Sequence, residues 1–330
     1  MIIQADSGLK KIVVNLYILR GGVQVLSACT EKIMDTQFWW FYDVIVLAVV
    51  MIFMFICGKR GIVKSILSTV SWALAAVIAF SISGSIAASI YTTSIRGSNI
   101  KKVDKSMDSE FFAVKMAEYI DSLPYGLRAD SKKINNMIDR GDVSIDEMIK
   151  YINNINGKRV ASDEELHDVV IEGYTKVIGD LLSKDFSDYI VEYAKNEVKA
   201  DPSKMAEIIP LMRDKENTKP ASSMIADNYT APAYRIIIRL MGFIILTVVI
   251  AIFAEFIIKS FTSANSATST VSNLVGALVG ILMGLVVIFM VTAMVRLYVI
   301  MGTDHMMFFN TEAIDKTYAF KYIFNIVQKM

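Results

Sequence analysis

The chain has 330 residues, and its apolar share of 54% and mean hydropathy of +0.46 exceed those of soluble domains, in which about 45 to 50% of residues are apolar. Its 34 basic and 33 acidic residues nearly cancel, which excludes the global positive field of a nucleic-acid-binding protein. Two cysteines allow neither a disulfide framework nor a CxxC metal site, so we expect a membrane protein without metal or cofactor.

Charge and proline divide the chain into apolar ends and a polar middle. Of the 33 acidic residues, 25 lie between residues 91 and 235, as do all 5 prolines. We expect, in order, an N-terminal extension outside the fold, a transmembrane hairpin, a polar helical insertion, a second transmembrane hairpin and a C-terminal amphipathic helix. These segments are 1–37, 38–95, 96–234, 235–300 and 301–330.

The N-terminal extension has the outline of a lipoprotein signal that ends at Cys29. Arg20 and the following glycine pair interrupt its apolar region, which a signal peptide needs unbroken over about 7 to 15 residues. Met34 is an alternative start, because "MDTQFWWFYDVIVL" is a typical beginning for a membrane protein. We therefore expect the fold to begin near residue 38.

Four apolar runs reach the roughly 20 residues that a bilayer-spanning helix needs. The sequence thus predicts an all-α membrane protein with four transmembrane helices in two hairpins and a large helical insertion between the second and third. The runs are 38–57, 65–90, 236–260 and 273–299.

Asp43 follows a belt of aromatic residues, "FWWFY", at the start of the first run. Aromatic rings are typical of a membrane interface, and a carboxylate near a helix start complements the free backbone N–H groups there. Asp43 is therefore interpreted as an interfacial helix-start residue, with a polar or ion site as the alternative.

"GKRGIVK" joins the first two runs by a tight corner. We expect Gly58 to supply the left-handed φ that ends the first helix and Gly61 to let the second begin close by. Because short basic loops remain cytoplasmic, the corner predicts that the insertion and both termini face outward. The corner residues are Gly58, Lys59, Arg60, Gly61 and Lys64.

The insertion has apolar residues at steps of three and four, which predicts amphipathic helices. "EELHDVVIEGYTKVIGDLLSKDF" shows the pattern best. Such helices need a partner surface, which is each other, the bilayer or another protein. Its apolar positions include Val169, Val170, Tyr174, Val177, Ile178, Leu181 and Leu182.

Glu255 is an acid within the third apolar run. A charge at mid-membrane costs at least ~2.5 kcal/mol, so we expect it to pair with Lys259 at i+4 near the interface or to serve as a proton or cation site. Arg239 and Arg296 lie near the outer ends of their runs, and we expect them to extend to the interface.

Three glycines recur every four residues in the last run: Gly276, Gly280 and Gly284. In lipid, small residues let helix backbones approach closely, so we interpret this stripe as a packing surface for the small residues of the second run. A pore lining is the alternative.

The tail "NTEAIDKTYAFKYIFNIVQKM" predicts an amphipathic helix on the outer leaflet, or one that binds a partner. Its apolar stripe is Ile314, Tyr318, Tyr322, Ile326 and Met330. His167 and His305 have no further metal ligand at helical or loop spacing, and no GxSxG, HExxH, P-loop or dinucleotide motif occurs. We therefore do not expect an enzyme.

The corner "GKRGIVKSILS" and the glycine series in "SNLVGALVGILMGLVVIF" together resemble the CvpA family of colicin V production proteins. The resemblance covers the membrane segments, roughly residues 38–95 and 235–325. The longer Gram-positive members of that family also carry a helical insertion. It implies a bacterial inner-membrane protein that acts as an accessory or scaffold in toxin production or export and in envelope homeostasis, with membrane proteins or other copies of itself as partners. An ion-coupled transport or channel subunit that uses Glu255 is the alternative, and a sensor is a third.

Overall fold

The computed structural model describes four stretches of the chain, and every regular element within them is a helix. The expected N-terminal extension, 1–37, lies outside the described residues. The described stretches are 39–214, 217–261, 269–302 and 311–329.

The chain forms two compact units, whose boundary falls within two long helices. We call the described residues up to 78 and from 244 onward the apolar unit, and those of 79–243 the insertion unit.

Four helical stretches are long and apolar enough to cross a membrane. Two of them end close to the predicted limits, whereas the other two continue as helix for 45 and 42 residues, well beyond the apolar runs 65–90 and 236–260. No proline interrupts the second stretch. In the third, Pro220 stands in the first turn, where proline is tolerated, and Pro232 comes two residues after the end of a π-helical segment, Ala226–Thr230. The four stretches are Trp40–Arg60, Ile62–Ser106, Lys219–Ser260 and Thr270–Met301.

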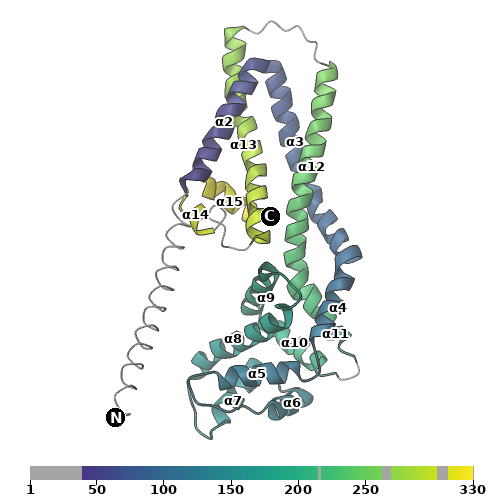
Figure 1. Cartoon of the computed structure of the whole chain (residues 1–330), viewed down its shortest axis with the longest axis vertical. Coiled ribbons are helices and arrows are strands. Elements are labelled where there is room, and N and C mark those ends of the chain that lie inside the picture. Colours follow the sequence, from purple (N-terminus) through teal and green to yellow (C-terminus); the bar gives the residue numbers. More distant parts are fainter. Residues whose placement is uncertain (1–38, 215–216, 262–268, 303–310, 330) are drawn as a thin grey trace, which may run out of the picture. The chain divides into compact units, whose positions relative to one another are not determined.

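The apolar unit is built on a close pair of helices, α2 (Trp40–Arg60) and α13 (Thr270–Met301), which lie side by side (Figure 1). It also contains the first part of α3 (Ile62–Ile90) and the last part of α12 (Ala231–Phe261). Two short helices, α14 (Thr311–Asp315) and α15 (Phe320–Gln328), pack against the end of the α2–α13 pair.

The glycine stripe of α13 packs against α2 rather than against the second apolar helix. A Cβ atom added at Gly276 would lie 2.7 Å from the carbonyl oxygen of Cys57, and one at Gly280 would lie 2.5 Å from that of Phe53. At Gly284 it would lie 3.0 Å from the Cα atom of Val50. The backbones can approach this closely only because α13 carries no side chain along the stripe.

The insertion unit continues both long helices through short π-helical segments and folds the rest of the chain into further helices. The segment η1 (Tyr91–Ile95) leads into α4, and α11 leads through η2 (Ala226–Thr230) into α12. The remaining helices are α4 (Arg96–Ser106), α5 (Phe111–Asp121), α6 (Ser131–Arg140), α7 (Ile145–Asn154), α8 (Asp163–Leu182), α9 (Asp188–Ala200), α10 (Ser203–Met212) and α11 (Lys219–Ile225).

Helix α8 is the centre of the insertion unit's core. It begins at a capping box, in which Ser162 and Glu165 each bind the other's backbone N–H. The predicted apolar face is confirmed: Val169 is partly buried against the core, and the other positions are buried. The fully buried side chains along α8 are Leu166, Val170, Tyr174, Val177, Ile178, Leu181 and Leu182.

The two π-helical segments bind each other. The Tyr91 hydroxyl donates to the Ala226 carbonyl oxygen at 3.1 Å, where the backbone ladder of η2 begins. Just beyond, the Arg96 guanidinium binds both carboxylate oxygens of Asp227, at 2.8 and 2.7 Å. A bidentate pair fixes orientation as well as distance, so it aligns α4 with η2.

Candidate functional site

Glu255 belongs to a polar cluster with Arg60 and Ser68 in the apolar unit. Arg60 is the last residue of α2, and Gly61, with φ at +77°, lets α3 begin at once and bring Ser68 beneath the corner. The Ser68 hydroxyl donates to Oε1 of Glu255, and Nη1 of Arg60 lies 3.8 Å from the same oxygen. Nη1 of Arg60 also lies 3.5 Å from the Ser68 hydroxyl.

The cluster offsets the cost of a carboxylate in an apolar helix. The Glu255 side chain is 21% exposed and that of Arg60 is 44% exposed. A long arginine side chain can reach along an apolar surface, and here it extends from the corner toward the acid. A charge within an apolar span normally pairs or carries out a function, and here the guanidinium supplies the opposite charge. The arrangement can hold the Glu255 carboxylate in place, with Ser68 and Arg60 both directed at Oε1.

The predicted pairing of Glu255 with Lys259 is wrong, because among the described residues its charged partner is Arg60. Sequence reasoning missed Ser68 as well. The available signal was the pair of serines, Ser65 and Ser68, three residues apart directly after the basic corner. Both are buried on α3.

The corner residues have individual roles. Gly58 is helical within α2, so the expectation that it supplies the left-handed φ is wrong, and Gly61 does so. A Cβ atom at Gly58 would lie 3.3 Å from the Asn273 carbonyl oxygen, so this glycine permits close approach of α13. Lys59 lies over the Phe55 ring at 4.2 Å, and Lys64 is partly exposed on α3.

The corner and the start of α13 lie at the same end of the apolar unit. The backbone N–H of Ile62 donates to the Ser272 hydroxyl at 3.1 Å. Ser269, which caps α13, is therefore near the corner, while the loop before it, 262–268, lies outside the described residues.

Asp43 does not cap its own helix. Its carboxylate accepts hydrogen bonds from the backbone N–H groups of Tyr318, Ala319 and Phe320 at 2.8, 2.9 and 3.1 Å. These groups form the start of α15, at the end of α2 away from the corner (Figure 1). Asp43 and Glu255 therefore belong to separate sites, as the sequence predicts.

Arg296 binds the other end of α15. It is 7% exposed, and its Nη1 donates to the Val327 carbonyl oxygen, so its guanidinium binds protein backbone rather than extending away from the fold. Between the two polar contacts, the Phe320 ring stacks on Tyr42 with centroids 4.7 Å apart.

The tail folds as two helices rather than one. Ile314 of the predicted stripe is buried within the protein, and the buried face of α15 is formed by Phe320, Phe324 and Val327. Tyr318, Tyr322 and Ile326 point outward, with Tyr318 75% exposed. Met330 and His305 lie outside the described residues.

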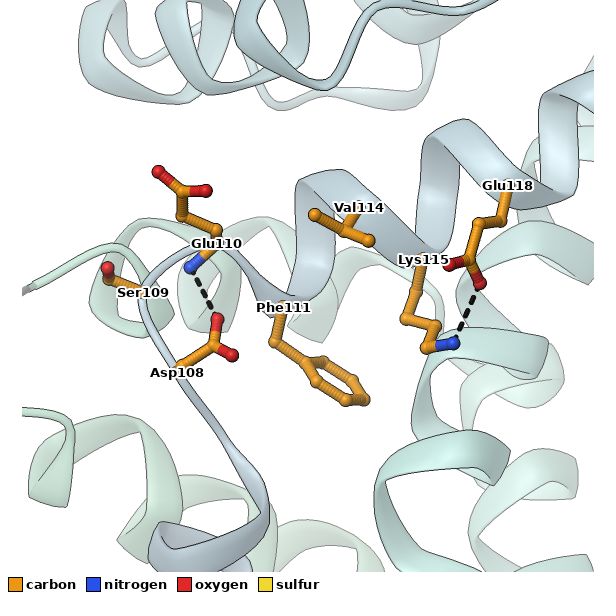
Figure 2. A pocket seen from close by; sticks show the side chains of 7 residues that line it. All are labelled: Asp108, Ser109, Glu110, Phe111, Val114, Lys115 and Glu118. Carbon is orange, nitrogen blue, oxygen red and sulfur yellow. Dashed lines mark hydrogen bonds and ion pairs between the residues drawn. The ribbon is translucent and has the colours of Figure 1, made fainter.

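A depression of about 590 Å³ lies on the insertion unit, next to the start of α5. Figure 2 shows the side chains that line it. The Asp108 carboxylate accepts from the backbone N–H of Glu110 at 2.8 Å, and the Lys115 ammonium donates to the Glu118 carboxylate at 2.7 Å. That hydrogen bond raises the pKa of Lys115. The lining residues are Asp108, Ser109, Glu110, Phe111, Val114, Lys115 and Glu118.

The described residues contain no group of three or more His, Cys, Asp and Glu side chains that is placed to hold a metal ion. His167 is half exposed on α8, and its Nδ1 lies 3.7 Å from the carboxylate of the adjacent Asp168. Comparison of the chain with protein-family models, curated proteins and solved structures finds no match.

Proposed function

We propose that this chain is a four-span bacterial inner-membrane protein that acts as a scaffold or accessory factor in the production or export of colicin V-type toxins and in envelope homeostasis. The observation that carries the proposal is a compact helical unit with its own core, α4 to α11, attached through continuous helices to two apolar spans. Such a unit presents a large polar surface to other proteins of the membrane. The sequence resemblance to the CvpA family supports the toxin and envelope roles.

The proposed arrangement is two hairpins, with the basic corner cytoplasmic and the insertion and both termini outside. Lys59, Arg60 and Lys64 support it through the preference of short basic loops for the cytoplasm. The hydrogen bond between Ile62 and Ser272 supports placing the second connection, 262–268, on the same side as the corner.

Cysteine accessibility in whole cells tests this topology. The native cysteines are replaced, and single cysteines are introduced by Ser183→Cys, on the exposed surface after α8, or by Ser266→Cys. Labelling of position 183 alone by an impermeant reagent is expected. Labelling of position 266 alone would invert the topology and place the insertion in the cytoplasm.

A complementation assay tests the role itself. Hosts that carry a colicin V-type toxin system but lack their own CvpA protein should secrete more toxin when this chain is supplied. A variant without the ion pair between α4 and η2, Arg96→Gln with Asp227→Ala, should be inserted normally and fail to restore secretion. Unchanged secretion with the intact chain would contradict the toxin role.

An ion-coupled transport subunit is the second candidate, and the polar cluster around Glu255 favours it. In this mechanism, entry of a proton or cation at Glu255 displaces Arg60 and separates α12 from the corner. Glu255→Gln would then abolish function at normal expression, whereas the scaffold proposal expects function to persist.

A further inference from the structure

Helix α15 has two apolar faces, and protein covers one of them. Phe320, Phe324 and Val327 are at most 2% exposed against α2 and α13. On the other side, Tyr322 and Ile326 are 65% and 59% exposed, and Tyr318 lies one turn before them. If this face of the nine-residue helix lay in water, its apolar side chains would contribute no hydrophobic stabilisation.

The two polar contacts of α15 fix its depth relative to the apolar helices. Asp43 is the fourth residue of α2, and Arg296 lies five residues before the last residue of α13. At 1.5 Å per residue, both lie roughly 5 to 8 Å inside the helix ends. The hydrogen bonds to Phe320 and Val327 therefore hold α15 level with the ends of the apolar helices rather than beyond them.

The outward face has the chemistry of a membrane interface. The Tyr318 ring packs edge to face with Trp39, with centroids 5.3 Å apart, and so continues the aromatic belt of α2, in which Trp40 is also exposed. Asn325 and Lys329 are exposed on the same side of α15. Aromatic rings combined with amide and ammonium groups fit the boundary between headgroups and acyl chains, whereas a hydrocarbon-facing surface would exclude the last two.

We propose that α15 is an interfacial membrane helix, whose outward face of Tyr318, Tyr322 and Ile326 lies among the lipid headgroups and first methylene groups of one leaflet. Asp43 and Arg296 hold it there, so the segment adds a lipid-contacting element beside the spans. This inference rests on the proposal that α2 and α13 cross the bilayer.

Spin-label accessibility in reconstituted vesicles tests the inference. Single cysteines at Tyr322 and Ile326 are labelled in a chain that carries Cys29→Ser and Cys57→Ala, in vesicles of phosphatidylcholine and phosphatidylglycerol. Oxygen, which concentrates in lipid, should relax both labels several-fold more than a water-soluble nickel chelate does. A label at Lys150, exposed on α7, should show the opposite preference.

A label at Leu47, 64% exposed in the middle of α2, separates this inference from the proposal on which it rests. If the nickel chelate relaxes the labels at 322 and 326 more than oxygen does, while oxygen relaxes the label at 47 more, the interfacial helix is overturned and the spans remain intact. Low accessibility to both reagents at 322 and 326 would show a protein cover and overturn it as well. Nickel preference at position 47 would overturn both proposals.

Discussion

Asp43 and Arg296 hold opposite ends of the same short helix. The carboxylate of Asp43 accepts three backbone N–H groups at the start of α15, and the guanidinium of Arg296 donates to the Val327 carbonyl near its end. Each charge has the sign that the helix dipole favours at that end. The pair therefore explains why a nine-residue helix, too short to be stable alone, has a fixed place on α2 and α13.

Asp43→Ala should release α15 from α2. Three backbone N–H groups lose their acceptor, which should cost at least the ~1 to 2 kcal/mol of a lost helix cap. In detergent micelles, we expect trypsin to cleave at Lys316 and Lys321 several-fold faster than in the unsubstituted chain. Asp43→Asn keeps one acceptor oxygen and should give an intermediate rate; equal rates for all three chains would refute the role of Asp43.

Gly280→Ala should separate α2 from α13. The new methyl group would lie 2.5 Å from a backbone oxygen and 2.6 Å from the Met54 Cα atom, neither of which can rotate away. Overpacking of this kind costs about 1 to 3 kcal/mol, so the melting temperature should fall by several degrees. Gly97→Ala is the control, because its methyl group meets nothing within 4 Å and should leave the melting temperature equal or higher.

The sequence predicts the glycine stripe but not its partner, and the reason is physical. At Gly280 the missing side chain of α13 creates the space, so α2 approaches with its ordinary backbone at Phe53 and Met54. The small residue that α2 itself contributes, Gly58, lies in the basic corner, where the sequence suggested a turn rather than a packing role. The small residues of α3, which suggested the wrong partner, instead include Ser83 near Gly242 of α12.

The tail shows a second limit of local patterns. Its four-residue apolar step predicts one continuous helix, yet the helix is interrupted at residues 316–319. Asp43 binds backbone N–H groups that this interruption leaves free. That acid is 275 residues away, so no local pattern contains it. Helix α8 lies at the other extreme: its cap and apolar step are local, and both were predictable.

Ser162→Ala should destabilise the insertion unit through the start of α8. The change removes the hydroxyl that accepts the Glu165 N–H at 3.2 Å, which should cost about 1 kcal/mol in the free energy of unfolding. Ser187→Ala is a matched control, because Ser187 precedes α9 without a side-chain cap bond. Denaturant unfolding monitored by circular dichroism should distinguish the two variants, and equal losses would contradict the capping role.

Tyr193 should make stability fall at alkaline pH. Burial, with a smaller contribution from Glu197, raises its pKa from 10.0 to about 12. The folded state thus retains a proton that the unfolded state loses, so the stability is complete below pH 10 and is lost as the pH rises to about 12. Tyr193→Phe should show a shallower decline of unfolding free energy between pH 10 and 12, and an unchanged decline would exclude this contribution.

The different exposure of Arg60 and Glu255 predicts that substituting one of them costs more stability than substituting the other. Arg60 is 44% exposed and reaches water when its partner is removed, so Glu255→Gln should cost less than about 1 kcal/mol and keep the Ser68 contact. Arg60→Gln leaves the carboxylate, 21% exposed, without a cation in an apolar helix and should cost about 1 to 3 kcal/mol.

The double variant decides between a structural anchor and an ion site. For an anchor, adding Glu255→Gln to Arg60→Gln removes the uncompensated charge and should restore stability and function together, which thermal unfolding and the secretion assay measure on the same samples. For an ion site, stability should return while function stays lost, because no carboxylate is left to bind the ion. Lys259→Gln, which alters the partner that the sequence suggested, should change neither quantity if Arg60 is the cation that holds Glu255.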